Sequence, residues 1–165
     1  MKEIFVRLDR CVGCHTCEIA CAVEHSQSKN LFSAISEHPV PRRRLFVEWV
    51  APGQKIPVLC RHCTDAPCMH ACISGAIRRT PEGVVLTDTD KCIGCWTCVM
   101  VCPYGVIGRH PEMQRAYRCD RCPDREVPAC VASCPTRALV YRTVEEFSAG
   151  VRRTAAAEML AGERG

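Results

Sequence analysis

Sixteen cysteines in four groups of four carry the chemistry that this chain of 165 residues can perform. Within each group, two to seven residues separate successive cysteines, so sulfur atoms on one loop can converge on one site. Thiolates are soft ligands that select iron–sulfur clusters, zinc or Cu(I) over hard cations. The groups are Cys11, Cys14, Cys17 and Cys21; Cys60, Cys63, Cys68 and Cys72; Cys92, Cys95, Cys98 and Cys102; and Cys119, Cys122, Cys130 and Cys134.

The spacing of the first and third groups, C-x2-C-x2-C-x3-C, is typical of iron–sulfur clusters. In this run three thiolates hold one [4Fe–4S] cluster, and the fourth, carried on a helical turn, ligates a second cluster. The third and fourth groups also end in the proline that completes the pattern, Pro103 and Pro135. Sixteen thiolates suffice for four [4Fe–4S] clusters with none left over, so four such clusters are the expected cofactors.

Zinc and disulfides are the two other uses of closely spaced cysteines. Structural zinc sites contain C-x2-C pairs like Cys60/Cys63 and Cys119/Cys122, but they do not need the third and fourth cysteines that occur twice at fixed spacing. A disulfide framework needs an export signal and an oxidising compartment, whereas this chain opens with a strand-like alternation over residues 2–8. A zinc-stabilised scaffold without redox function remains the alternative from a different functional class.

Bound clusters would change the net charge of the protein and would contribute to its stability. The formal net charge is +4, but ligating thiolates and four oxidised cluster cores together would bring the loaded protein to about −4. Lysines and arginines are scattered without a basic helix or interleaved aromatic residues, so we expect no nucleic-acid binding. Only 5% of the residues are aromatic. Much of the stability must therefore come from ligation, and the apo-protein is expected to be largely unfolded.

Motifs for membrane insertion, export and catalysis are not found in the sequence. No stretch approaches the roughly twenty apolar residues of a membrane span, and neither end carries a secretory or lipidation signal, so we expect a cytoplasmic location. The sequence has no phosphate-binding loop, nucleophile motif or dinucleotide fingerprint. We therefore expect no catalytic residue and no substrate site in this chain.

The pattern between the cysteine groups predicts short helices and hairpins. After Cys72, Cys102 and Cys134 the chain repeats a turn with Pro or Gly and then an apolar pair that begins a strand, whereas a helix continues beyond Cys21. The helix at the C-terminal end has an apolar side and begins with a capping box, Thr143-x-x-Glu146. The expected elements are hairpins of 45–50 with 55–59 and of 76–79 with 84–87, an irregular surface loop over 26–44, and a helix over 143–161.

The cysteine motifs resemble a known family. Cys-Arg-His-Cys at 60–63, Cys-Ile-Gly-Cys at 92–95, Arg-Cys-Asp-Arg-Cys at 118–122 and the closing Cys-Pro pairs are similar to those of four-cluster ferredoxin-type electron-transfer subunits. The family includes the β-type subunits of dimethyl sulfoxide reductase, polysulfide reductase and formate dehydrogenase. It also includes shorter iron–sulfur proteins of carbon monoxide dehydrogenase, hydrogenase and aldehyde oxidoreductase systems. The resemblance covers residues 3–141, and the length fits the compact members.

The resemblance implies a fold and a ligand assignment. In the family the first cysteine group pairs with the fourth and the second with the third, in an α+β fold of two nested ferredoxin-like lobes with the clusters in a line. Residues 1–25 and 103–142 would form the outer lobe, 45–102 the inner lobe, 26–44 a surface loop, and 143–165 a C-terminal helix and tail. The implied ligand sets are Cys11, Cys14, Cys17 and Cys134; Cys119, Cys122, Cys130 and Cys21; Cys60, Cys63, Cys68 and Cys102; and Cys92, Cys95, Cys98 and Cys72.

The implied function is electron transfer between protein partners. The chain would relay single electrons between a catalytic oxidoreductase subunit and a second redox partner; a free soluble polyferredoxin is the alternative. The catalytic subunit would be a tungsten or molybdenum aldehyde oxidoreductase, a carbon monoxide dehydrogenase, a formate dehydrogenase or a hydrogenase. Because no cysteine position is vacant, His15, His62 and His70 are expected to tune clusters or lie at the surface. The terminal helix either packs on its own lobe or docks on the catalytic subunit or a second copy.

Overall fold

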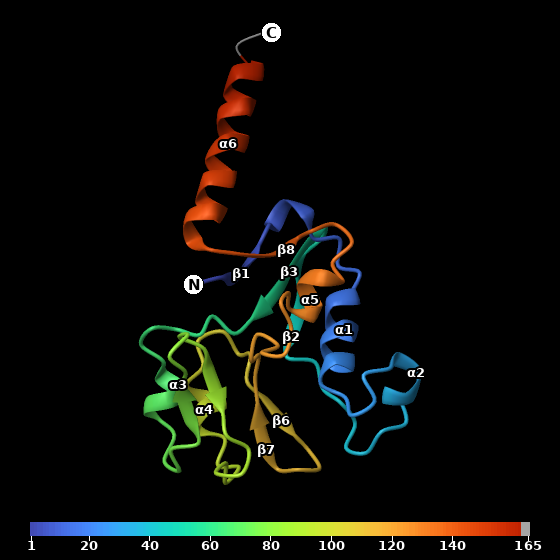
Figure 1. Ribbon diagram of the computed structural model, residues 1–165, viewed down its shortest axis with the longest axis vertical. Coiled ribbons are helices and arrows are strands. Elements are labelled where there is room, and N and C mark those ends of the chain that lie inside the picture. The colour runs from blue at the N-terminus through green and yellow to red at the C-terminus, as the bar shows by residue number, and fades with distance from the viewer. Residues whose placement is uncertain (163–165) are drawn as a thin grey trace.

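The computed structural model describes residues 1–162 of the chain. Short helices alternate with four two-stranded antiparallel sheets, so the expected α+β class is confirmed (Figure 1). The elements are β1 (Glu3–Val6), η1, a 3-10 turn (Leu8–Arg10), α1 (Thr16–Glu24), α2 (Leu31–Ala34), β2 (Leu45–Ala51), β3 (Gln54–Leu59), α3 (Pro67–His70), β4 (Ile77–Arg79), β5 (Val85–Thr87), α4 (Thr97–Met100), β6 (Gly108–His110), β7 (Arg115–Tyr117), α5 (Ala129–Ala132), β8 (Leu139–Arg142) and α6 (Val144–Gly162).

Pairing of β1 with β8 joins the two ends of the cysteine-bearing chain. The antiparallel register runs from Glu3 opposite Arg142 to Val6 opposite Leu139. A further backbone bond, from the Arg7 N–H to the Ala138 carbonyl at 2.7 Å, continues the ladder. Because the first cysteine group follows β1 and the fourth precedes β8, this sheet brings the two groups side by side.

Two apolar cores form around cysteines. The first combines Ile4, Leu45 and Leu139 with buried cysteines of the first and fourth groups. The second combines Ile77 and Ile107, among others, with cysteines of the second and third groups. Each core therefore includes cysteine side chains, so the expected metal ligands also take part in core packing.

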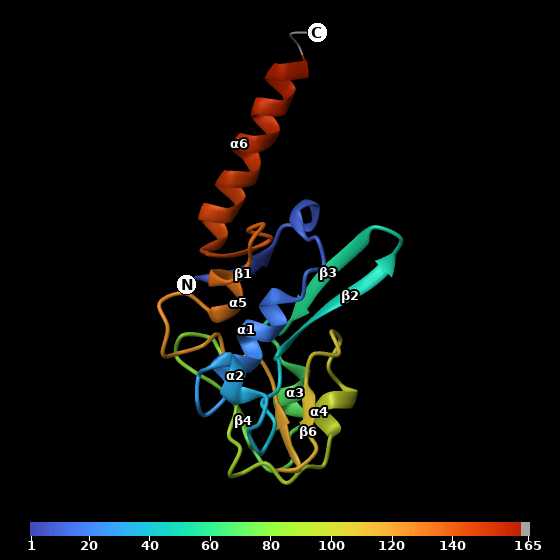
Figure 2. The ribbon, with the colours of Figure 1, turned by 90° about the vertical axis from the view of Figure 1, so that its right-hand side faces the viewer.

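The two expected hairpins are confirmed, and a third appears that the sequence analysis missed. Strand β2 pairs with β3, with a register shift between Trp49 and Ala51, and the hairpin extends to one side of the body (Figure 2). Strand β4 pairs with β5, and the missed hairpin joins β6 to β7. All four of these strands have three residues, but β4 and β5 contain the β-branched residues Ile77 and Val85, whereas β6 and β7 contain none of the residues by which a strand is most readily recognised, Val, Ile and Thr.

The surface loop over 26–44 contains one helical turn, α2, which corrects the expectation of a wholly irregular segment. The Asn30 side chain begins this turn by accepting hydrogen bonds from the backbone N–H groups of Phe32 and Ser33, at 3.0 and 3.2 Å. Asn is a favoured residue at this capping position because its side chain satisfies donors that the helix leaves unpaired. The cap was present in the sequence, but a single turn of four residues produces no helical periodicity.

Helix α6 begins as predicted and then extends away from the body. The Thr143 hydroxyl accepts from the Glu146 N–H at 3.2 Å, and the Glu146 carboxylate accepts from the Thr143 N–H at 2.9 Å, which is the reciprocal capping box. Phe147 stacks on Phe5 of β1 with ring centroids 4.4 Å apart. No residue of α6 is buried, and its outer turns stand clear of the body (Figures 1 and 2).

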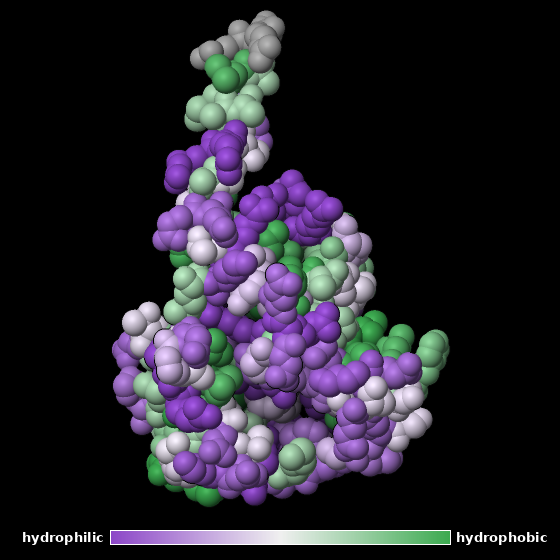
Figure 3. Space-filling model, viewed as in Figure 1, coloured by the Kyte–Doolittle hydropathy of each residue, from purple (hydrophilic) through white to green (hydrophobic). Residues whose placement is uncertain are grey.

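The apolar side of α6 is exposed rather than packed along its own lobe, so the structure departs from the first of the two expected arrangements. Val144, Val151 and Met159 are all at least half exposed, and the apolar surface of the outer turns is visible in Figure 3. Among the described residues, no helix is long and apolar enough to cross a bilayer.

Truncation of α6 should separate its anchored first turns from its exposed outer turns. Removing residues 151–165 should shift the midpoint of thermal unfolding by less than about 2 °C, because surface changes cost within about 0.5 kcal/mol. Removing 143–165 also deletes the Phe147–Phe5 stacking, which is worth about 1 kcal/mol, and should lower the midpoint by about 2–4 °C. Circular dichroism of the iron-loaded proteins at one scan rate measures both. Equal losses in the two truncations would contradict this division of the helix.

Candidate iron–sulfur sites

All sixteen cysteines are free thiols, and most lie around two hollows or two buried clusters of sulfur. The first hollow is lined by Cys60, Cys63, Cys68 and Cys102, among others, and is called here the Cys60 hollow. The second is lined by Cys72, Cys92, Cys95 and Cys98, among others, and is called the Cys95 hollow. Each hollow thus takes three cysteines from one sequence group and one from the other.

The Cys14 set consists of Cys11, Cys14, Cys17 and Cys134. Cys17 lies on α1 and Cys134 follows α5, and these two helices pack against each other. Burial, followed by the charges of Glu18, Cys134 and Cys14, raises the pKa of Cys17 to about 11. Cys11 packs on the same core as Cys17 and Cys134. The structure therefore brings the fourth cysteine of the last group to the first three of the chain.

The Cys119 set consists of Cys21, Cys119, Cys122 and Cys130. Burial raises the pKa of Cys21 and of Cys119 to about 12. The pKa of Cys130 is also raised, by burial and then by the neighbouring Cys119, Cys21 and Cys122. Buried thiols of this kind stay protonated until a cation joins them, since a bound metal deprotonates its thiol ligands. The set has the donor chemistry of a metal–sulfur cluster.

Electrostatic interactions link each set to a neighbouring set. Cys17 of the Cys14 set adds to the raised pKa of Cys130 in the Cys119 set, after the effects of burial and of nearer thiols. Cys60 likewise adds to the raised pKa of Cys119, for which burial is the main cause. Arg118 bonds to Cys68 of the Cys60 hollow, and its charge offsets part of the burial effect on Cys98 in the Cys95 hollow. These interactions agree with a line in the order Cys14 set, Cys119 set, Cys60 hollow and Cys95 hollow.

The two ends of this line differ from its middle in exposure and hydrogen bonding. Cys14 and Cys95, one in each terminal set, are exposed. Hydrogen bonds from the Thr16 and Thr97 hydroxyls are the main causes that lower the pKa of these two thiols. The sequence analysis missed this feature, although a visible signal existed. Each terminal set has two cysteines followed two residues later by Ser or Thr: Cys14, Cys134, Cys72 and Cys95.

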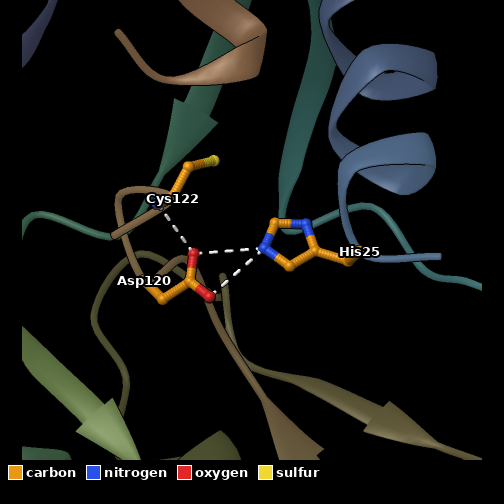
Figure 4. A group of neighbouring side chains, drawn as sticks. All are labelled: His25, Asp120 and Cys122. Carbon is orange, nitrogen blue, oxygen red and sulfur yellow. Dashed lines mark hydrogen bonds and ion pairs between the residues drawn. The ribbon is translucent and has the colours of Figure 1, made fainter. Parts of the chain in front are cut away.

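The sequence analysis also missed a charged network of His25, Asp120 and Arg44 beside the Cys119 set. His25 Nε2 lies 3.1 Å from the Asp120 carboxylate (Figure 4). The other ring nitrogen, Nδ1, lies 2.7 Å from the Cys21 carbonyl oxygen. Arg44 donates to the same carboxylate. Burial alone would raise the pKa of Asp120, but the His25 hydrogen bond and the Arg44 charge outweigh it and hold that pKa well below its usual value.

The grouping of His25, Asp120 and Cys122 does not form a separate metal site. Their ligand atoms lie within 4.8 Å of one another. Both His25 ring nitrogens face oxygen acceptors, however, and the Asp120 carboxylate accepts from the Cys122 N–H at 3.0 Å (Figure 4). These groups are therefore committed to hydrogen bonds that position the loop of the Cys119 set.

The three histidines singled out from the sequence lie in different surroundings. His15 pairs with Glu18 at 2.9 Å, and His70 pairs with Asp65 at 2.7 Å near the surface. His62 is buried and lines the Cys60 hollow. In the described part of the chain, two buried side-chain nitrogens have no hydrogen-bond partner, His62 Nε2 and Arg118 Nη2, and both residues line this hollow. Such orphaned donors fit an anionic, acceptor-rich occupant such as the sulfides of a cluster.

Comparisons with known proteins agree with this donor set. Residues 53–144 match the family model described as a 4Fe-4S dicluster domain. The chain is 36% identical to "Iron-sulfur protein" of Rhodospirillum rubrum, over 98% of this chain and 92% of that protein. It is 37% identical to "Electron transport protein HydN" of Escherichia coli strain K12, over 94% of this chain and 97% of that protein.

A relative that belongs to a named reductase is also similar. "Probable anaerobic dimethyl sulfoxide reductase chain YnfG" of Escherichia coli strain K12 is 34% identical, over 87% of this chain and 74% of that protein. The residues that line the two hollows lie within the matched domain. The chain belongs to the family of 4Fe-4S ferredoxin-type electron-transfer subunits.

Proposed function

We propose that this chain holds four [4Fe–4S] clusters and relays single electrons between a catalytic oxidoreductase subunit and a second redox partner. The observation that carries the proposal is the pair of hollows that are each lined by four cysteines from two different sequence groups. That exchange of the fourth cysteine is the arrangement in which two [4Fe–4S] clusters share two cysteine runs. It also supports two nested lobes, the inner one built on the second and third groups.

Each proposed ligand set takes three cysteines from one run and one from its partner run. When bound, the clusters would supply one-electron chemistry, and the protein would supply the thiolates, the surroundings and the order. The proposed sets are Cys11, Cys14, Cys17 and Cys134; Cys21, Cys119, Cys122 and Cys130; Cys60, Cys63, Cys68 and Cys102; and Cys72, Cys92, Cys95 and Cys98.

The linear order of the sets supports a conductor with two ends. Exposed Cys14 and Cys95 lie in the terminal sets, whereas all four cysteines of the Cys119 set are buried. An electron would therefore enter near one exposed cysteine and leave near the other. Because all sixteen thiols would be used as ligands, we further propose that the chain carries no substrate site of its own and that the chemistry occurs on the catalytic subunit.

The names of the relatives support an oxidoreductase complex as the setting. One relative is named an electron transport protein and another a chain of a probable dimethyl sulfoxide reductase. We propose a catalytic partner from the same broad class, among the molybdenum or tungsten oxidoreductases, carbon monoxide dehydrogenases, formate dehydrogenases and hydrogenases.

Metal analysis tests the proposal. Anaerobically purified protein should contain about sixteen iron and about sixteen sulfide per chain, because four thiolates hold each four-iron cluster. The protein should be brown and should bleach when dithionite is added. A colourless protein with about four zinc per chain and negligible sulfide would overturn the redox function and support the zinc scaffold.

A further inference from the structure

Arg118 is a buried cation whose surroundings are unusual among the arginines of this chain. It follows β7, immediately before Cys119, and is 2% exposed. Its Nη1 donates to Cys68 Sγ at 2.9 Å and its Nε donates to the Thr87 hydroxyl at 3.0 Å. Its Nη2 is buried without a partner. Two donors of one guanidinium are therefore placed at or beside the Cys60 hollow.

No carboxylate compensates the charge of Arg118 within residues 1–162. Arg121, the other buried arginine, has Glu3 at 3.9 Å and donates to the Lys2 carbonyl oxygen. The partly buried Arg44 is paired with Asp120. Arg118 instead donates to the Thr87 hydroxyl and to the Cys68 sulfur. Burying an unpaired charge is costly, so the sequence retains a cation whose counter-charge must be supplied by the occupant of the Cys60 hollow.

His62, which also lines this hollow, carries a second orphaned donor. Its Nδ1 accepts the Val85 N–H at 3.0 Å, which leaves the ring proton on Nε2, the nitrogen that is buried without a partner. The fixed tautomer and the orphaned guanidinium nitrogen are separate observations that point to one acceptor-rich group.

The cation beside the neighbouring Cys119 set, in contrast, has a protein counter-charge. The Asp120 carboxylate pairs with Arg44 and His25 and accepts from the Cys122 N–H at 3.0 Å. At the Cys60 hollow, the Arg118 guanidinium donates to Cys68 Sγ and has no carboxylate within ion-pair distance among the described residues. An occupant of this hollow therefore faces a cation that the protein itself does not neutralise.

We propose that Arg118 and His62 donate hydrogen bonds to the cluster held in the Cys60 hollow and make that cluster easier to reduce. This inference rests on the proposed function. In the electron-transfer step, the cluster in the hollow gains one electron, an adjacent cluster in the line loses one, and no proton moves. Reduction adds one negative charge, and hydrogen bonds and surrounding charge are known to set the potential of such clusters. Arg118 and His62 act as positioning residues through these bonds.

The test is a redox titration of the full chain, purified without oxygen and followed by electron paramagnetic resonance. Arg118→Gln removes the cation, and Arg78→Gln, at an exposed position on β4, is the matched control. Cys102→Ser identifies the signal that belongs to the Cys60 hollow. At a fixed potential, Arg118→Gln should lower the reduced-to-oxidised ratio of this signal about tenfold, which corresponds to about 59 mV for a one-electron couple. The control should leave the ratio unchanged.

Iron and sulfide counts distinguish failure of the proposed function from failure of the proposed role of Arg118. Wild-type protein without about sixteen iron per chain would contradict the proposed function itself. If wild-type and Arg118→Gln proteins both retain their clusters and the assigned signal does not shift, the proposed function stands and this inference is overturned.

Three further variants test the inference if Arg118→Gln loses its clusters. Arg118→Lys retains the charge but not the forked donors, and it should lower the ratio about threefold. His62→Gln retains an N–H donor and should shift the signal less than His62→Leu, which has none. Unchanged ratios in Arg118→Lys, or equal shifts in the two His62 variants, would overturn the roles of those residues.

Discussion

Removal of iron should unfold this chain rather than leave an empty fold. Helices α2 to α5 have four residues each, and every sheet has two strands. Helices of this length and isolated two-stranded sheets are marginal in water. Thiols form part of both cores, so the apolar contacts depend on where the sulfur atoms are held. A structural metal site contributes about 10–16 kcal/mol, which is comparable with the roughly 5–15 kcal/mol stability of a whole domain.

Far-ultraviolet circular dichroism during anaerobic chelation measures this effect. Loss of the visible cluster absorption and of most helix and strand signal should occur together. Protein kept under the same conditions without chelator is the control, and adding iron and sulfide back should restore both signals. An apo-protein that still shows a cooperative thermal transition at an unchanged midpoint would contradict the prediction.

Two cysteines lie one turn apart on α1, and replacing each of them with serine should damage a different cluster. Cys17 and Cys21 both lie on this helix, but Cys17 lies with Cys134 and Cys21 lies with Cys130. We therefore expect Cys17→Ser and Cys134→Ser to alter one paramagnetic signal, and Cys21→Ser and Cys130→Ser to alter another. Each change should remove up to about four of about sixteen irons, the content of one cluster.

The matched control is Ala22→Ser, which places the same new side chain on α1 at a position that is not a proposed ligand. It should leave the iron content and all signals unchanged. If Cys17→Ser and Cys21→Ser altered one common signal, each cysteine run would hold its own cluster, and the exchange of fourth cysteines would be wrong.

Features that depend on local spacing could be predicted from the sequence. The hairpin of β2 with β3, the hairpin of β4 with β5 and the capping box at Thr143 all depend on residues a few positions apart. The membership in an iron–sulfur family also followed from spacing, because the cysteine runs are short and specific. The missed elements are local as well, but α2 is too short to produce a helical period, and β6 and β7 lack the β-branched residues that marked β4 and β5.

The sequence by itself thus determined the ligand type, the family and the short elements that carry the cysteines. Only the tertiary structure decided how these elements meet and what surrounds each sulfur. Arg118 reaches Cys68 across 50 positions, and His25 reaches Asp120 across 95. The β1–β8 pairing that joins the chain ends spans nearly the whole sequence. Charge, burial and orphaned donors act over a few ångströms in space, whatever the separation along the chain, so no spacing rule could reveal which set of cysteines would receive the buried cation.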